Sequence, residues 1–107
     1  MRLDVRELTW DDPAVLARAR ADGAHGVYVW NALAAHEGEG FVVRADGRDA
    51  LQVWIGPRGN LVVSGTVDPP AALAARVADT IVARPCPWRI AMGPPAVLAE
   101  LRARLRA

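Results

Sequence analysis

Three short runs of apolar, mostly β-branched residues stand close together between Phe41 and Val67. The turn Asp46–Gly47 separates the first run from the second, and the turn Gly56–Asn60, with the sequence GPRGN, separates the second from the third. Turn residues of this kind between apolar runs are the strongest local signal for β-hairpins. The pattern therefore predicts a three-stranded antiparallel meander.

Successive side chains of a strand point to opposite faces of a sheet, so the meander has two faces. One face is uniformly apolar and is the predicted core face: Phe41, Val43, Leu51, Val53, Ile55, Leu61, Val63 and Val67. The other face mixes polar and apolar side chains: Val42, Arg44, Gln52, Trp54, Val62, Ser64 and Thr66. Two interpretations of this mixed face stay open, a ligand groove or a second core beneath a helix.

The chain before the meander reads as a strand followed by two helices. The alternation in Arg2–Arg6 predicts a half-buried strand with Leu3 and Val5 on one side. Asp11 or Asp12 can cap a helix that has Pro13 in its first turn and that ends near Asp22 at Gly23.

The second of these helices is predicted from Val27 to about His36, apolar on almost every side and therefore buried or paired. A strand over Val27–Trp30 is the alternative, because β-branched and aromatic residues favour strands. Residues 36–40 are predicted to form an acidic loop that leads into the meander.

After the meander, Asp68–Pro70 is predicted to open a helix that runs to about Arg84, with Asp68 as its cap. Its buried stripe consists of Leu73, Ala74, Val77, Ala78 and Ile81. A short strand over Trp88–Met92 comes next. The last helix carries Val97, Leu98, Leu101 and Leu105 on one face and a Glu100–Arg104 pair at i,i+4 spacing.

This order of elements predicts an α/β (α+β) fold built on a mixed sheet. A strand that ends the meander, a crossing helix and a returning strand form a βαβ unit, so the strand at 88–92 should lie parallel to the third meander strand. With 107 residues the chain has the size of a single domain, residues 1–107.

Composition narrows the classes of partner. No apolar run approaches the roughly 20 residues of a membrane span, and the first residues lack the apolar segment of a signal peptide, so we expect a cytoplasmic protein without a membrane partner. All thirteen basic residues are Arg, but the net charge of +1 gives no reason to expect a nucleic-acid partner. The basic cluster Arg102, Arg104 and Arg106 is explained by the dipole of the last helix.

Catalytic and metal-binding patterns are weak. Cys86 stands between two prolines with no histidine near it in sequence, so we interpret it as a structural or incidental thiol. His25 and His36 lack the paired spacing that zinc sites need, so no metal site is predicted.

The most informative residues are those of a possible groove or interface, because tryptophan is favoured at both cores and interfaces. That set comprises Trp30, Arg44, Trp54, Asn60, Ser64 and Trp88.

The succession of elements resembles the GNAT superfamily of N-acetyltransferases without its last two strands. Residues 5–12 (VRELTWDD) are similar to the usual GNAT opening of a strand with Arg, a polar turn and an acidic cap. Residues 59–62 (GNLV), the proline-capped helix after that strand, and residues 90–94 (IAMGP), which lead into an amphipathic helix, resemble the amino-terminal, non-catalytic domain of bacterial tandem GNAT proteins. The resemblance implies a GNAT-like mixed sheet.

The resemblance also locates a cofactor loop, and here the chain departs from the family. Active GNAT enzymes present a Q/R-x-x-G-x-G/A loop to the pyrophosphate of acyl-coenzyme A, as helix N-termini generally bind anions. At the matching place stands Gly65–Pro70 (GTVDPP), in which two prolines remove N–H donors and Asp68 adds a negative charge. The strands around it also lack the carboxylate that the family uses as a base, so no catalytic, cofactor-binding or metal residue is predicted.

The leading hypothesis is a non-catalytic GNAT-like domain, an accessory or ligand-sensing module of an acetyltransferase, without a cofactor. The first alternative is an active N-acetyltransferase that binds acetyl-CoA at an atypical site. The second is a structural module that forms a homodimer.

The strand over Trp88–Met92 is expected at an open sheet edge, and open edges are normally covered or paired. We therefore expect a second copy of the chain, or a catalytic GNAT domain, as partner.

Overall fold

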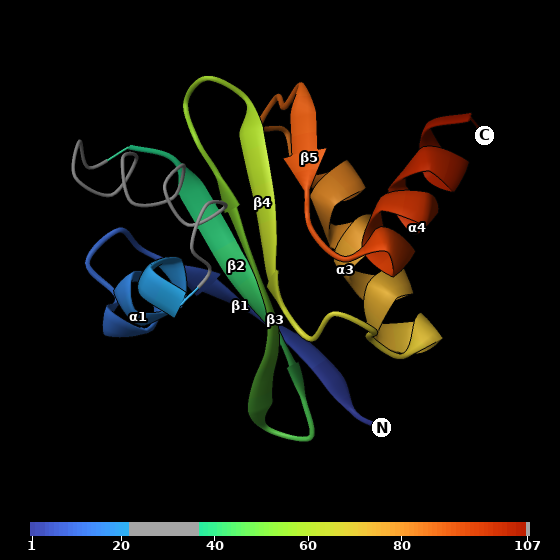
Figure 1. Ribbon diagram of the computed structural model, residues 1–107, viewed down its shortest axis with the longest axis horizontal. Coiled ribbons are helices and arrows are strands. Elements are labelled where there is room, and N and C mark those ends of the chain that lie inside the picture. The colour runs from blue at the N-terminus through green and yellow to red at the C-terminus, as the bar shows by residue number, and fades with distance from the viewer. Residues whose placement is uncertain (22–36, 107) are drawn as a thin grey trace.

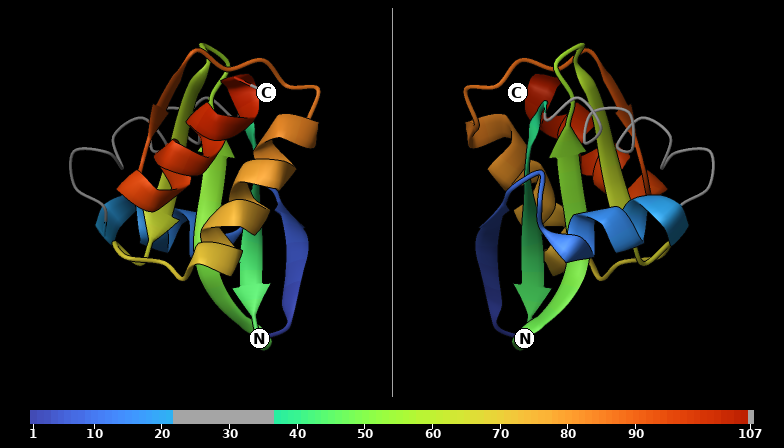
Figure 2. Two further views of the ribbon diagram at one scale, coloured as in Figure 1. Left: turned by 90° about the vertical axis from the view of Figure 1, so that its right-hand side faces the viewer. Right: turned by 90° about the vertical axis from the view of Figure 1, so that its left-hand side faces the viewer.

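The computed structural model describes residues 1–21 and 37–106 and shows a five-stranded mixed sheet with helices on both faces (Figure 1). The strands lie in sequence order: β1 (Leu3–Leu8), β2 (Glu39–Ala45), β3 (Arg48–Ile55), β4 (Asn60–Gly65) and β5 (Ile90–Met92). Helix α1 (Pro13–Ala21) covers one face, and helices α3 (Ala71–Ala83) and α4 (Pro95–Arg106) cover the other (Figure 2).

The predicted meander and βαβ unit are both confirmed. β2, β3 and β4 pair antiparallel in turn, with Val53 opposite Phe41 on one side and Val63 on the other. β1 pairs antiparallel with β2, and β5 pairs parallel with β4. The apolar alternation of the sequence fixes this register, because a shift of one residue would turn every core side chain toward the opposite face.

The main core lies between the sheet and helices α3 and α4. Seven of the eight side chains predicted for the core face are buried there, together with the whole predicted stripe of α3 and with Val97 and Leu101 of α4. Leu3 and Val5 pack against this core from β1, as their alternation predicts. Burial of these apolar side chains is the main stabilising contribution of the fold.

A second, smaller core lies between α1 and the opposite face of the sheet. It contains Leu8, Val15, Val42, Trp54 and Val62, and Trp54 is only 2% exposed. The Trp54 ring packs over Gly40 of the neighbouring strand, where a Cβ atom would lie 2.4 Å from the ring. The mixed face of the meander is therefore a second core in this part of the sheet, and Trp54 packs beneath a helix.

A β-bulge changes the orientation of the first residues of β3. Val43 pairs with Leu51, but Arg44 pairs with Asp49, so one extra residue, Ala50, lies on the β3 side. A bulge of this kind shifts the alternation of side chains along the strand. Asp49 consequently lies opposite Arg44 and on the α1 side of the sheet, the side that Gln52 also faces.

The bulge also explains a glycine at the end of β4. A Cβ on Gly65 would lie 2.4 Å from the carbonyl oxygen of Ala50, and the φ angle of Gly65 is +140°. Only glycine tolerates both the close approach and this backbone conformation.

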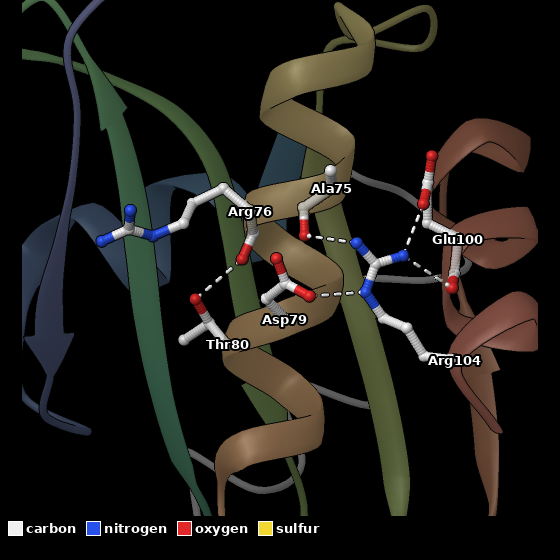
Figure 3. Close-up of polar contacts among 6 residues, drawn as sticks. All are labelled: Ala75, Arg76, Asp79, Thr80, Glu100 and Arg104. Atoms are coloured by element: carbon white, nitrogen blue, oxygen red, sulfur yellow. Dashed lines mark hydrogen bonds and ion pairs between the residues drawn. The ribbon is translucent and has the colours of Figure 1, made fainter. Parts of the chain in front are cut away.

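Ion-pair networks tie the layers together at two places. Arg104 of α4 donates to a carboxylate oxygen of Asp79 at 2.6 Å and to the carbonyl of Ala75 at 3.4 Å, both on α3, and also to the Glu100 carboxylate (Figure 3). The predicted Glu100–Arg104 pair is thus confirmed, and Arg104 joins two helices.

At the end of α3, the Arg84 guanidinium donates to both carboxylate oxygens of Glu7 on β1, at 2.7 and 2.8 Å. It also donates to Glu39 of β2 at 3.4 Å and lies 5.1 Å from the centre of the Phe41 ring. Arg84 therefore fastens the edge strand β1 to the centre of the fold.

Several boundary predictions are wrong. β4 ends at Gly65, so Val67 lies in the following loop and is 71% exposed instead of part of the core. Asp68 does not cap α3, because the helix begins at Ala71 after the cap residue Pro70, which offers no side-chain hydrogen bond. Leu105 is 63% exposed in the last turn of α4.

The other corrections concern strand ends. β5 begins at Ile90, two residues after Trp88, and its ladder starts with Ile90 beside Asn60 of β4. The N–H groups of Arg89 and Ile90 both donate to the Gly59 carbonyl at this end. Residues 39 and 40, expected in a loop, already belong to β2. The predictions for Gly23, His25, His36, Trp30 and the segment 27–36 lie outside the described residues.

Candidate ligand-binding site

A cavity of about 310 Å³ lies between α1 and the strands β2, β3 and β4. Helix α1 contributes Ala17, Arg18 and Ala21 to its wall, and the sheet contributes Val42, Asp49, Ala50, Leu51, Gln52 and Ser64. The cavity therefore lies on the α1 face of the sheet, next to the second core. Its volume is at the lower end of the range of small-molecule sites.

Two buried polar side chains form the sheet wall of this cavity. Gln52 of β3 and Ser64 of β4 are cross-strand neighbours and are 9% and 7% exposed. Neither side chain makes a hydrogen bond within residues 1–21 and 37–106. Their polar atoms open to the cavity, because the fully buried side-chain nitrogen and oxygen atoms without a partner in the described residues belong to Arg44 and Trp54 instead. An amide and a hydroxyl that line a cavity in this way are groups to which water or a bound molecule can hydrogen-bond.

Opposite charges reach the same cavity from its two sides. Arg18 comes from α1 and is exposed, and no hydrogen bond or ion pair holds it within the part of the chain that the structure describes. Asp49 comes from the bulged start of β3, and its carboxylate lies 3.4 Å from the Arg44 guanidinium. The cavity can therefore interact with a negative group on the helix side and a positive group on the sheet side.

A second cavity, of about 260 Å³, opens at the carboxyl ends of β4 and β5. Its lining is mostly apolar and contains no charged side chain: Val63, Ser64, Gly65, Val67, Gly93, Pro94 and Pro95. The helices that start beside it, α3 and α4, are preceded or begun by prolines 69, 70, 94 and 95. Proline carries no N–H group, so these helix ends offer fewer donors to an anion than usual. Ser64 borders both cavities.

The six residues predicted for a groove do not form one site. Ser64 lines both cavities, whereas Trp54 is buried in the second core and lines neither. Arg44 lies near the first cavity only through its ion pair with Asp49. Trp88 packs against the main core on the other face of the sheet, and Asn60 lies at the far end of β4 from Ser64. Trp30 lies outside the described residues.

Sequence reasoning missed three residues of the first cavity. Gln52 was placed on the correct face but not in the predicted groove, although a polar residue amid an apolar strand was the available signal. Asp49 was missed because strict alternation puts it on the face opposite Gln52, and no sequence signal marks the bulge. Arg18 was missed because an exposed arginine on a helix is ordinary.

Other candidate chemistry stays weak. Burial raises the pKa of the Cys86 thiol, and the neighbouring Glu39 carboxylate raises it further, so the reactive thiolate is disfavoured. Within the described residues, no three His, Cys, Asp or Glu side chains gather as metal ligands. No helix in the same part of the chain combines the length and apolar character needed to cross a membrane.

Comparisons with known proteins give no relative for this chain. No protein-family model matches it, and neither the curated proteins nor the solved structures contain a match.

Proposed function

We propose that this chain is a non-catalytic, GNAT-like, cytoplasmic domain that binds a small molecule in the cavity beneath α1 and serves as an accessory or sensing module of an acetyltransferase. The observation that carries the proposal is the pair Gln52 and Ser64, buried in the wall of a ligand-sized cavity without hydrogen-bond partners in the described chain. Polar side chains that line a cavity within an otherwise apolar sheet face are the kind of group that orients a small ligand.

The order of elements supports the GNAT-like part of the proposal. A strand and helix, a meander, and a crossing helix with a parallel strand follow one another in the described residues as they do in that superfamily. The proline-rich helix starts and the uncharged lining of the second cavity support the non-catalytic part, since that lining offers no carboxylate to act as a base.

One observation favours acyl transfer as a second candidate. Ser64 borders both cavities, so a donor at the carboxyl ends of β4 and β5 and an acceptor beneath α1 would meet at this residue. In this candidate acetyl-CoA is the cofactor, and the second cavity holds its acyl end. A homodimerisation module is less favoured, because dimerisation alone does not account for the polar side chains in the cavity beneath α1.

The expected partner binds at the β5 edge of the sheet. β5 has three residues, and no further strand pairs beyond it in the described chain. Unpaired backbone groups at such an edge can accept another strand. A catalytic GNAT domain is the partner that the proposal predicts, and a second copy of this chain is the alternative.

Two titrations followed by amide NMR shifts test the proposal. We expect compounds from a panel of small polar metabolites to shift the Gln52 and Ser64 signals saturably, and acetyl-CoA to leave residues 63–67 and 93–95 unchanged. Saturable shifts of the second group by acetyl-CoA, together with acetylation of an amine by the chain alone, would establish the second candidate instead. A panel without any saturable shift would refute ligand binding beneath α1.

A further inference from the structure

We infer that the cavity beneath α1 selects small zwitterions, of the size and charge arrangement of a free α-amino acid. This inference rests on the proposed function, because it names the ligand class of the same cavity. It is carried by three features that meet there: a cation on the helix, an anion brought to the sheet wall by the bulge, and the polar side chains of Gln52 and Ser64. Neither the cation nor these two polar side chains have a partner among residues 1–21 and 37–106.

Arg18 supplies the group for a carboxylate. It lines the cavity from α1, and it makes no ion pair in the part of the chain that is described. A guanidinium can donate two parallel hydrogen bonds to one carboxylate, which fixes orientation as well as charge. The two other α1 residues in the lining, Ala17 and Ala21, are small and leave room beside it.

Asp49 supplies the group for an ammonium. Its only described ion pair is with Arg44 at 3.4 Å, which is too long for a strong hydrogen bond, and its side chain is 49% exposed. Arg44 in turn donates to the Gly47 carbonyl, within the turn of the hairpin. A carboxylate has about four acceptor positions, so Asp49 keeps capacity for a further cation.

The volume of the cavity and its neutral polar side chains narrow the class of ligand further. A cavity of about 310 Å³ admits an amino-acid-sized molecule and is too small to enclose a dinucleotide or a whole coenzyme A. The Gln52 amide both donates and accepts, and so does the Ser64 hydroxyl, so each can pair with a polar atom of a carboxylate, an ammonium or a side chain. A hydrocarbon ligand would leave these groups unpaired.

The test is a titration of the full chain with free α-amino acids as probes, each matched with its N-acetyl derivative and its amide. The first derivative lacks the positive charge and the second lacks the negative one, while size stays similar. Binding is followed by backbone and side-chain amide NMR shifts at Gln52 and Ser64. We expect at least one free amino acid to bind and removal of either charge to weaken binding about tenfold or more.

Two surface substitutions provide the matched test on the protein side. Arg18→Gln should weaken binding of the free amino acid but leave affinity for its amide unchanged. Asp49→Asn should also weaken binding of the free amino acid, but it should leave affinity for the N-acetyl derivative unchanged. Arg48→Gln, at the exposed position next to Asp49, is the control and should change neither.

The outcomes separate this inference from the proposed function. Saturable shifts at Gln52 and Ser64 by neutral or singly charged compounds, equal to those by zwitterions, would overturn the zwitterion inference and keep the cavity as a ligand site. Absence of shifts with every amino acid and derivative at about 10 mM, a concentration that would reveal even millimolar affinity, would overturn the zwitterion inference. The proposed function falls only if the panel of small polar metabolites also gives no saturable shift. Binding that survives both Arg18→Gln and Asp49→Asn would also overturn the inference.

Discussion

Removal of the Ser64 hydroxyl should not destabilise the unliganded protein. In an ordinary core, Ser→Ala breaks a hydrogen bond, and the loss is about 1 kcal/mol. Ser64 is 7% exposed and has no hydrogen-bond partner in the described chain, so Ser64→Ala removes an unpaired group instead. A fully buried unpaired polar group costs about 1–3 kcal/mol, and the cost for the Ser64 hydroxyl is smaller because it lines a cavity that water can enter. We therefore expect the free energy of unfolding to stay unchanged or to rise by about 1 kcal/mol.

Val62 offers a matched control on the same strand and face. It is 1% exposed and belongs to the second core, where it packs with Trp54. Val62→Ala removes two methyl groups and leaves a small cavity, for which we expect a loss of about 2 kcal/mol. The two substitutions thus have opposite expected effects, although they lie two residues apart.

Equilibrium unfolding in urea measures both effects. The midpoint should stay or rise for Ser64→Ala and fall for Val62→Ala, with equal slopes for all three proteins, since a changed slope would indicate a different denatured state or an intermediate. A loss of about 1 kcal/mol or more for Ser64→Ala would refute the reasoning. It would show that the hydroxyl is paired within the folded chain and serves stability.

Four further predictions concern the contacts that hold the sheet and helices together. Arg84→Gln should lower the free energy of unfolding by about 1–2 kcal/mol, because the variant loses two exposed carboxylate pairs and a contact with the Phe41 ring. A double-mutant cycle with Glu7→Gln should give a coupling energy between Arg84 and Glu7 of about 0.5–1 kcal/mol. Arg84 lowers the pKa of Glu7 below its ordinary value of 4.5, so the stability difference between wild type and Glu7→Gln should be full above that pH and should disappear as the pH falls further. Gly40→Ala should cost about 2 kcal/mol or more in urea unfolding, because its Cβ would lie 2.4 Å from the tryptophan ring of β3. Arg104→Gln should lower the thermal midpoint, whereas Arg102→Gln, at an exposed position of the same helix, should not.

Three of these predictions can fail in a definite way. A coupling near zero would show that the Glu7–Arg84 pair adds no stability, and that Arg84 acts through Glu39 and the Phe41 ring. A stability difference for Glu7→Gln that persists unchanged in acid would contradict the lowered pKa. Equal effects of the Arg104 and Arg102 substitutions would show that the contacts in Figure 3 add nothing to the general helix-dipole effect.

The sheet could be predicted from the sequence because its signals are local and repeated. Alternating apolar residues and two glycine-containing turns define β2, β3 and β4, and the stripe of α3 with its proline borders defines the crossing helix. Boundaries were less certain for a physical reason. Val67 continues the apolar alternation, but β4 ends at Gly65, which lies against the bulge of β3. The loop after Gly65 leads through the prolines at 69 and 70 to α3, and alternation does not predict the path of such a loop.

The candidate site was only partly predictable. The mixed character of the meander's second face placed both Gln52 and Ser64 on the correct side of the sheet, but only Ser64 was among the residues predicted for the groove. The same pattern also singled out Trp54, which proved to be a core residue, because alternation gives the face of a side chain but not what covers it. The position of Asp49 follows from a bulge that depends on a contact between β3 and Gly65 of β4, and no local sequence signal reveals such a contact.

The central claim is that Gln52 and Ser64 are kept for a ligand at the expense of stability. The most direct test compares wild type with the double variant Gln52→Leu/Ser64→Ala in thermal unfolding, with and without the amino acid that gives the largest midpoint increase in wild type. The claim predicts a double variant with an equal or higher midpoint without ligand and no increase on its addition. A double variant that unfolds at a lower temperature, or that keeps the ligand-induced increase, would contradict it.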